Sequence, residues 1–442
     1  MLFPSSPVQF VYLVRLADWW TEPATTADGA PKQHPDMGRP TFLFLFGVLP
    51  FAVGVLALEA LRGPHNAHRV VSRHVLQLGL VLRRKPSSSQ MYLPSYLGSF
   101  SIGELVFLAF LVGGNLVLFV FGWICMSSYY PLAGESYTFY TTLQVLGVVL
   151  GYSCVFNMAL LFIPATRNSA WMEFMGISYA NGMKFHRWLG VATVVTAVGH
   201  ALPFYPIWYH KGQLWVEAMP CWDCSLDYFS KGYPAWFNVF GELSLFFMLV
   251  VAMTSVPWIR RKLFETFYYA HYAFVPAVVF AVLHWGLIVW WLLPTFTIYL
   301  VDRVVGSTNS WTPTVIEQCT VLGDGILKVV VRRSTQRGGG FEVGQFVYMK
   351  VPAISTWQWH PFTIGSSPRA NPTSFTIWLK SLGDWTEDLV EHVRMCEQNC
   401  EQPTVHIDGF YGASLESFDQ YATLCLVGGG IGVTPLTTAD RH

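Results

Sequence analysis

Charged residues are scarce in this 442-residue chain. Asp, Glu, Lys and Arg make up only 12% of it, whereas a soluble globular protein carries about 25%. The 27 basic and 27 acidic residues also cancel, so the chain has no net charge with which to attract a nucleic acid. Apolar residues make up 52% instead. These values exclude a disordered chain, a nucleic-acid-binding protein and an ordinary soluble enzyme, and they indicate a protein that lies partly in a lipid bilayer.

Cysteine is also infrequent. Eight residues are too few for a scaffold built from disulfides in a chain of this length. Cys221 and Cys224 form a CxxC pair, for which a local disulfide is a simpler explanation than a metal-handling role. The cysteines after residue 303 match no nucleophile motif. Cysteine chemistry is therefore not expected to carry the function.

Long apolar runs fill residues 41 to about 305. A span needs about 20 apolar residues to cross a hydrocarbon core of about 30 Å. Seven runs qualify or nearly qualify: roughly 41–61, 102–125, 138–163, 186–206, 236–257, 266–284 and 286–302. The last is short and contains Pro294. The sequence predicts an all-α bundle of about seven spans, preceded by a loosely structured tail, 1–40.

Lys and Arg are concentrated in alternate loops. They number six in loop 62–101 and recur in loops 164–185 and 258–265, whereas loop 126–137 has none and loop 207–235 has two. Because basic loops stay in the cytoplasm, this distribution sets the orientation. We expect the N-terminal tail on the outer side and the region after residue 303 in the cytoplasm.

Histidines interrupt the apolar runs at paired positions. His186 and His200 lie on the fourth predicted span, and His271 and His284 lie on the sixth. Ionisable groups at membrane depth are costly and point to function. A spacing of 14 residues is about 21 Å and close to four turns, so one histidine of each pair lies near each membrane face. The 13-residue pair is about 140° out of phase on an ideal helix, and a kink at Pro276 is needed to realign it.

Near each membrane face, one histidine from each of the two helices then lies at the same depth. Each of these two depths, called levels below, offers two imidazoles. That arrangement suits a planar haem ligated on both sides, which transfers single electrons because no iron position is open. Zinc fits poorly, since no Cys or carboxylate completes a tetrahedral set. Arg187 follows His186 at the cytoplasmic edge, where it either pairs with a haem propionate or acts only as a topology-setting charge.

Two segments carry a resemblance to a known family. PATRNSAWMEFMGISYANGMKFHRWLG (164–190) and RRKLFETFYYAHYAF (260–274) resemble the starts of the two haem-binding helices of the ferric reductase and NADPH oxidase superfamily. The histidine spacings are similar too, and the resemblance extends from about residue 100 to the C-terminus. It implies two b-type haems, held by His186 with His271 and by His200 with His284. That family has six membrane helices with haems on the third and fifth, so the first span here is expected to be an N-terminal addition.

The region after residue 305 has the pattern of a soluble domain. Five strand-like runs lie between 312 and 380, punctuated by Gly and Pro, which predicts a small antiparallel β-barrel. HPFTIGSSP (360–368) and LKSLGDWTEDL (379–389) resemble the flavin segments of the same family. The resemblance implies that FAD contacts His360, Pro361, Phe362, Thr363, Lys380, Gly383, Asp384, Trp385 and Thr386. A helix over 385–395 would offer its N-terminal amides to the pyrophosphate.

The end of the chain resembles the start of a nicotinamide domain. VHIDGFYGA (405–413) is similar to the family's linker, and a predicted strand, 422–427, precedes a Gly-rich turn. The resemblance assigns NADPH, with NADH as the less favoured alternative, to Gly428, Gly429, Gly430, Gly432, Thr434 and Pro435. The chain stops ten residues after Gly432, so we expect an incomplete α/β domain, a truncated chain and an unpaired strand.

These expectations combine into one architecture. The tail 1–40 precedes a transmembrane haem domain, 41–305, a ferredoxin-reductase-like FAD barrel, 306–415, and the start of an NAD(P)H-binding domain, 416–442. The resemblance implies an oxidoreductase, placed in the plasma membrane, that passes electrons from cytoplasmic NADPH through FAD and two haems to ferric or cupric chelates outside. Two alternatives stay open: an oxidase that forms superoxide from oxygen, and a truncated, inactive haem protein.

Overall fold

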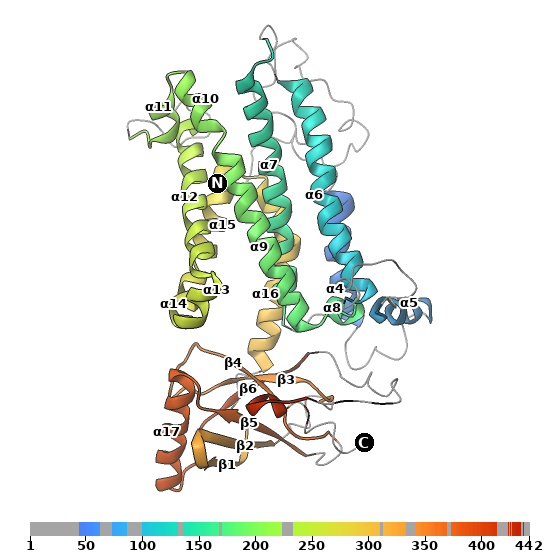
Figure 1. Ribbon diagram of the computed structural model, residues 1–442, viewed down its shortest axis with the longest axis vertical. Coiled ribbons are helices and arrows are strands. Elements are labelled where there is room, and N and C mark those ends of the chain that lie inside the picture. The colour runs from blue at the N-terminus through green and yellow to red at the C-terminus, as the bar shows by residue number, and fades with distance from the viewer. Residues whose placement is uncertain are drawn as a thin grey trace. The chain divides into compact units, whose positions relative to one another are not determined.

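The computed structural model describes residues 44–61, 73–85, 100–130, 136–167, 170–222, 233–309, 313–332, 341–368 and 373–412, together with 423, 425, 427–434 and 436. The chain forms two compact units, each assembled from separate stretches of sequence (Figure 1). The first comprises 1–57, 104–165 and 182–298, and the second comprises 58–103, 166–181 and 299–442. The predicted tail, 1–40, lies outside the described residues.

Long helices dominate the first unit. Among the described residues up to 309, the helices are α4 (Leu49–Leu61, preceded by a π-helical turn, Phe44–Val48), α5 (Arg73–Arg83), α6 (Ile102–Tyr129), α7 (Phe139–Leu161), α8 (Ala170–Phe174), α9 (Tyr179–Ala201), α10 (Phe204–His210), α11 (Leu214–Ala218), α12 (Tyr233–Thr254), α13 (Pro257–Lys262), α14 (Phe264–His271), α15 (Phe274–His284) and α16 (Ile288–Asn309).

In the part of the chain that the structure describes, five stretches are long and apolar enough to cross a membrane: 102–129, 139–165, 179–210, 236–254 and 264–284. They coincide with the five middle spans predicted from the sequence, and the chain is an integral, multi-pass membrane protein. The first predicted span is a shorter apolar helix, 45–58. The seventh falls on α16, which is not among the five and carries Pro294 inside it and the charged pair Asp302 and Arg303 near its end.

Helices α6 and α7 illustrate how the membrane unit packs. A Cβ at Gly114 of α6 would lie 2.4 Å from the Phe156 ring of α7, so only glycine permits this close approach. Beside it, Asn115 and Asn157 exchange two amide hydrogen bonds of 2.8 and 3.0 Å. A buried amide pair satisfies its own donors and acceptors, which fixes the register of the two helices where no water is available.

The second unit contains two three-stranded antiparallel sheets. The strands are β1 (Ile316–Leu322), β2 (Ile326–Arg332), β3 (Phe346–Lys350), β4 (His360–Thr363), β5 (Ser374–Lys380) and β6 (His406–Tyr411). Their orders are β1-β2-β5 and β4-β3-β6. Isolated bridges, Thr314 to Val405 and Ile364 to Ile377, connect one sheet with the other. Five strands match predicted runs, so the antiparallel FAD-type domain is confirmed in outline.

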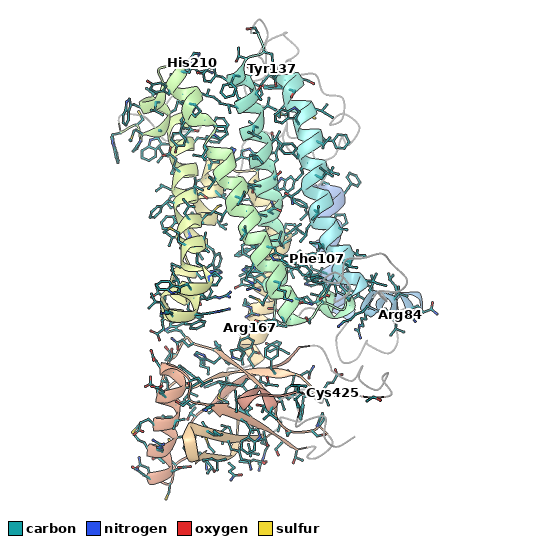
Figure 2. The ribbon with its side chains drawn as sticks, in the orientation of Figure 1. Arg84, Phe107, Tyr137, Arg167, His210 and Cys425 are labelled. Carbon is teal, nitrogen blue, oxygen red and sulfur yellow. The ribbon has the colours of Figure 1, made fainter. Side chains whose placement is uncertain are left out.

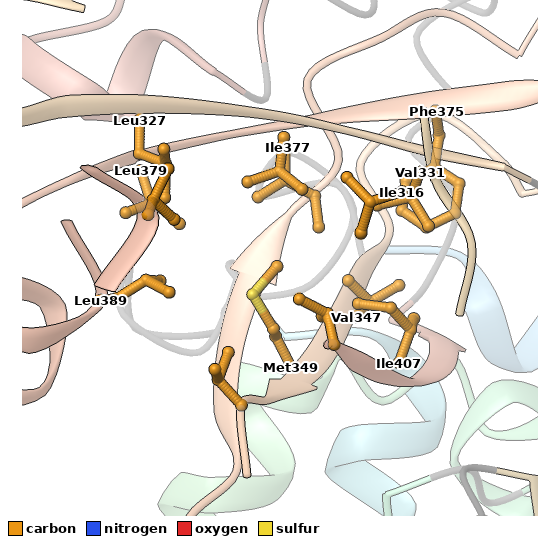
Figure 3. Close-up of a cluster of buried hydrophobic side chains, with 14 of the residues drawn as sticks. Ile316, Leu327, Val331, Val347, Met349, Phe375, Ile377, Leu379, Leu389 and Ile407 are labelled. Carbon is orange, nitrogen blue, oxygen red and sulfur yellow. The ribbon is translucent and has the colours of Figure 1, made fainter. Parts of the chain in front are cut away.

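The core of this domain lies between the two sheets and helix α17 (Asp384–Gln398). Leu327 and Ile377 from one sheet face Met349 from the other, and Leu389 of α17 covers one end (Figure 3). Each of these side chains is at most 1% exposed. Alternate residues of β2 and β5 are buried, as expected for strands with one face on a core.

Two sequence expectations need correction here. Residues 405–413, interpreted as a linker, contain strand β6, which pairs with β3. The predicted strand 422–427 is not formed by its described residues 423, 425 and 427, and Val427 is 86% exposed.

Candidate functional site

Four histidines of the membrane unit form two pairs across helices. The rings of His186 and His271 have centroids 6.2 Å apart with planes inclined by 53°. The rings of His200 and His284 have centroids 6.0 Å apart with planes inclined by 66°. Each pair combines one ring from α9 with one ring from α14 or α15. The structure thus brings together the residues that the spacing had grouped into two levels.

The ring separation matches one metal ion held between two imidazoles. A metal–imidazole bond is about 2.0 Å and a ring nitrogen lies about 1.1 Å from its centroid, so two opposed imidazoles on one metal have centroids about 6.2 Å apart. Among the described residues, no group of three or more His, Cys, Asp or Glu residues is placed to hold a metal ion. A haem supplies its own equatorial ligands and needs only two imidazoles, so the donor set fits a haem better than a zinc ion.

Main-chain carbonyls orient three of the four rings. Each of the three Nδ1 atoms lies within hydrogen-bonding distance of a carbonyl oxygen on a neighbouring helix: His186 with Leu161 at 3.1 Å, His200 with Gly147 at 2.8 Å, and His284 with Phe237 at 2.7 Å. A ring that donates from Nδ1 keeps Nε2 free as a ligand atom. The Nδ1 atom of His271 is buried and has no partner in the described part of the chain.

Glycines on α7 and α12 make room for the two outer rings. A Cβ at Gly151 would lie 2.8 Å from Nδ1 of His200, and a Cβ at Gly241 would lie 2.9 Å from Nδ1 of His284. Any larger residue would therefore have to displace the ring it faces. These two glycines were not identified from the sequence, because nothing in their local pattern reveals a histidine 40 to 50 residues away.

The helix carrying His271 and His284 is interrupted between them. Helix α14 ends at His271 and α15 begins at Phe274, so Pro276 lies in the first turn of α15. Proline is tolerated there because the first amides of a helix have no intrahelical acceptor. The kink that the 13-residue spacing required is present. Arg187, one residue after His186, is exposed, and no ion pair of Arg187 occurs within the described residues.

An aromatic group joins two of the predicted flavin segments. The rings of His360 on β4 and Trp385 on α17 stack with centroids 4.0 Å apart and planes at 24°, and Phe362 lies 6.0 Å from Trp385. Burial lowers the pKa of His360 to about 4, so its ring is neutral at neutral pH. The indole nitrogen of Trp385 is buried without a hydrogen-bond partner in the described residues. Pro361 is exposed and Thr363 is half-buried on the same strand.

The start of α17 forms a local cap. The hydroxyl of Thr386 accepts hydrogen bonds from the amides of Leu382 and Gly383, at 3.0 and 3.1 Å, and donates to the Gly383 carbonyl at 2.7 Å. The amides of Asp384 and Trp385 open the helix, where an α-helix offers no internal acceptor. Lys380 and Asp384 are exposed beside them. This leaves helix-start amides and one lysine ammonium available to a phosphate group.

The Gly-rich turn lies against the FAD-type domain. It includes a short 3-10 turn, Gly430–Val433, in which Gly430 has a φ of +55°, and the Thr434 hydroxyl donates to the Ile431 carbonyl. A Cβ at Gly365 would meet Trp378 at 2.6 Å and Thr434 at 2.7 Å, so the turn packs closely on this glycine. Gly428, Gly429 and Gly432 lie in the same turn, whereas Pro435 is outside the described residues.

A buried charged cluster in the second unit was missed by the sequence reasoning. Arg167 donates its amide to Asp302 at 3.0 Å, places its guanidinium 3.6 Å from Asp408, and stacks 3.8 Å above the Tyr348 ring. Arg303 pairs with Asp302. Burial raises the pKa of the Asp408 carboxyl, while a hydrogen bond with Tyr411 and the Arg167 charge oppose that shift. The cluster joins three segments that are far apart in the sequence.

The neighbouring Tyr179 extends this cluster to the start of α9. Its hydroxyl lies 2.6 Å from the Tyr348 hydroxyl, and its ring packs 5.1 Å from Phe346. Tyr348 pairs with Pro361 across the β3–β4 ladder. The first turn of the helix that carries His186 is therefore tied to a strand that neighbours the predicted flavin segment.

Only the first cysteine of the predicted CxxC pair lies within the described residues. Cys221 is bonded in a disulfide, and Cys224 lies outside the described residues. The cysteines at 125, 154, 319, 396, 400 and 425 form no disulfide within the described residues.

Comparisons with known proteins find a family match for the membrane helices and another for the FAD-type domain. The family described as "Ferric reductase like transmembrane component" matches residues 150–283, which include His186, His200 and His271 and end one residue before His284, and the family described as "FAD-binding domain" matches residues 313–415. The chain is 28% identical to Ferric reduction oxidase 2 of Arabidopsis thaliana over 414 residues, covering 91% of this chain and 54% of that protein.

Two further relatives show the same relationship. The chain is 30% identical to Probable ferric reduction oxidase 1 of Arabidopsis thaliana, covering 68% of this chain and 41% of that protein. It is 27% identical to a superoxide-generating NADPH oxidase heavy chain of Dictyostelium discoideum, covering 46% of this chain and 32% of that protein. The chain thus spans about half, or less, of the length of these relatives. With both family matches in the predicted order along one chain, the protein belongs to the superfamily of ferric reductases and NADPH oxidases.

Proposed function

We propose that this protein transfers electrons across a membrane, from NADPH in the cytoplasm to ferric or cupric chelates on the opposite side. The observation that carries this proposal is the presence of two cross-helix imidazole pairs, both with centroids about 6 Å apart, on the helices that the ferric reductase match covers. When bound, two haems supply one-electron carriers with no open coordination position, and FAD supplies the conversion from two electrons to one.

The membrane residues act by holding and orienting. His186 with His271, and His200 with His284, would hold one haem each. The carbonyls that accept from Nδ1 restrain ring rotation and leave Nε2 as the ligand atom. Because Gly151 and Gly241 leave room for the outer rings, that pair can keep its separation without displacing the helix backbones.

The cytoplasmic residues would hold the flavin. His360 and Phe362, backed by the buried ring of Trp385, present a neutral aromatic surface, which suits a planar ring system. Lys380 and the first amides of α17 offer positive charge and hydrogen-bond donors for the pyrophosphate. The Gly-rich turn from Gly428 to Gly432 is assigned to NADPH by its place in the sequence.

Sidedness follows from the basic loops. The side rich in Lys and Arg is assigned to the cytoplasm, which places the level of His186 and His271 near the electron donor and the level of His200 and His284 near the acceptor. A plasma-membrane location accords with an acceptor outside the cell. A superoxide-producing oxidase is the second candidate, because one relative is named as such.

Replacement of one outer ligand tests the proposal. In the full chain expressed in membranes, His200→Leu should lose about half of the bis-imidazole haem absorbance, because one of two ligand pairs is broken. His210→Leu is the matched control, since His210 stacks on Tyr140 at 4.0 Å outside both pairs and should retain full absorbance. Unchanged haem content in His200→Leu would refute the ligand assignment.

The acceptor is tested in the same membranes. After addition of NADPH, we expect reduction of a ferric chelate that is not abolished by superoxide dismutase. Superoxide output without direct chelate reduction would instead establish the oxidase. Haem bands that NADPH never reduces would show that the 442-residue chain is inactive by itself.

A further inference from the structure

Helix α5 exposes large apolar side chains on a charged surface. Leu78, Leu80 and Val81 are 52%, 62% and 43% exposed. All three lie within one turn of an eleven-residue helix. Three neighbouring exposed aliphatic side chains on a short helix indicate a surface that is covered by something other than water.

The face of α5 opposite Leu80 and Val81 is already occupied. A Cβ at Gly79 would lie 3.4 Å from the Phe174 ring of α8, and Leu82 is 9% exposed. The turn after α8 also approaches closely, because a Cβ at Gly176 would lie 2.8 Å from Cα of Arg83. α5 is therefore held firmly on one side, and its exposed face is a stable feature of the fold.

The end of α5 is fixed at the start of a membrane span. The Arg84 carbonyl accepts a hydrogen bond from the Ile102 amide at 2.8 Å, and Ile102 is the first residue of the candidate span 102–129. A main-chain bond to the first residue of a span places the end of α5 where the chain passes from water into lipid. The exposed face of α5 is thus within reach of the membrane surface.

The charges next to that face select one kind of surface. Arg83, Arg84 and Lys85 are consecutive and exposed (Figure 2 labels Arg84). Between Glu59 and Glu104 the sequence has six Arg and Lys residues and no acidic residue. A basic cluster beside an exposed apolar face is complementary to an anionic lipid leaflet, whose head groups attract the cations while the acyl boundary takes up the aliphatic side chains.

We propose that α5 is an in-plane membrane anchor. Leu78, Leu80 and Val81 insert into the boundary between head groups and acyl chains, and Arg83, Arg84 and Lys85 bind the phosphates of anionic lipids. The anchor lies between the first apolar helix and the span 102–129, so it would hold the α8 turn, and with it the segment leading to α9, at the membrane surface. This inference is independent of the electron acceptor.

A photo-crosslinking experiment tests the apolar contact. The full chain is purified into nanodiscs of phosphatidylcholine with a minor share of phosphatidylserine, with benzoylphenylalanine at Leu80 or, as a control, at the exposed Glu391 of α17. Lipid adducts at position 80 and none at position 391 are expected by mass spectrometry. Adducts at position 80 to a second copy, to another segment of the chain, or to nothing would overturn the proposal.

A charge-removal experiment tests the lipid class. Crosslinking at position 80 should yield more phosphatidylserine adduct than the bulk share of that lipid predicts. The combined Arg83→Gln, Arg84→Gln and Lys85→Gln variant should lower this enrichment by up to about fivefold per charge removed, while phosphatidylcholine adducts persist. The main-chain bond of Arg84 survives these changes, so the fold is retained. An enrichment that is unchanged in the variant would refute the role of the basic residues.

Discussion

Replacement of Arg167 by leucine is expected to destabilise the second unit strongly. Arg167 bridges two carboxylates, with its amide on Asp302 and its guanidinium on Asp408. Leucine at 167 keeps the main-chain bond to Asp302, whereas the Asp408 side chain loses the guanidinium and is only 5% exposed, so water cannot replace the lost cation. Removing one partner of a buried pair leaves the other charge uncompensated, which costs more than the pair itself contributes.

The geometry sets the size of the effect. At 3.6 Å and an effective dielectric constant of about 20, the attraction between Arg167 and Asp408 is about 4 to 5 kcal/mol before desolvation is subtracted. Breaking a buried pair costs about 3 to 5 kcal/mol, and Arg167 belongs at the lower end because its side chain is 22% exposed. We expect Arg167→Leu to lower the unfolding free energy by about 2 to 3 kcal/mol.

Thermal unfolding of the detergent-solubilised chain measures this loss. For a unit of roughly 200 residues, each kcal/mol shifts Tm by about 2 to 4 °C, so the fall should be about 5 to 10 °C. Arg332→Leu is the matched control, because Arg332 pairs with Glu317 at 3.0 Å but its side chain is 61% exposed. That exposed pair should contribute under about 1 kcal/mol.

A double variant separates the charge effect from lost packing. Arg167→Leu with Asp408→Leu removes both charges, and its Tm should recover part of the loss seen in Arg167→Leu alone. Equal Tm shifts for Arg167→Leu and Arg332→Leu, or a double variant whose loss equals the sum of the two single losses, would refute the reasoning.

Three further outcomes are expected. Gly241→Ala should reduce haem absorbance because its Cβ would meet the His284 ring at 2.9 Å. Gly113→Ala is the control, since no atom lies within 4 Å of a Cβ there, and it should keep full absorbance. Equal spectra for the two variants would contradict the packing argument. Asn157→Leu should leave the partner amide unsatisfied and destabilise the α6–α7 contact by about 1 kcal/mol, measured by thermal unfolding in detergent. Because burial lowers the pKa of His360, the unfolded state binds more protons than the folded state between pH 6.5 and 4, and the unfolding free energy falls as the pH falls through that window. His360→Phe should make this fall smaller. An unchanged dependence of the unfolding free energy on pH would contradict the prediction.

The sequence predicted the features that depend on local pattern. Apolar runs identified the five middle spans because length and composition alone decide whether a helix can cross a bilayer. Strand-like runs punctuated by Gly and Pro identified five strands of the FAD-type domain. Spacing along a helix identified the histidine levels, because His186 and His200 lie on one continuous helix, α9.

Other features depend on contacts between distant segments and have no local signal. Asp408 was interpreted as part of a linker, yet it lies in β6 and faces Arg167, 241 positions earlier. The approach of Gly241 to His284 depends on how α12 packs against α15, which no spacing rule encodes. A charged residue at a helix end, such as Asp302, is usually solvated, so its burial becomes apparent only once the second unit has folded.

The two segments that carry the histidines differ in how they bring both of their rings to the same side. On an ideal helix, a 14-residue spacing leaves two side chains about 40° apart, and a 13-residue spacing leaves them about 140° apart. Helix α9 is continuous and tolerates the small offset, whereas the other helix ends at His271 and restarts at Phe274. Both ring pairs nevertheless reach separations of 6.2 and 6.0 Å. The break before Pro276 therefore supplies the rotation that the spacing lacks, and the proline keeps that break in place by removing the amide that a continuous helix would require.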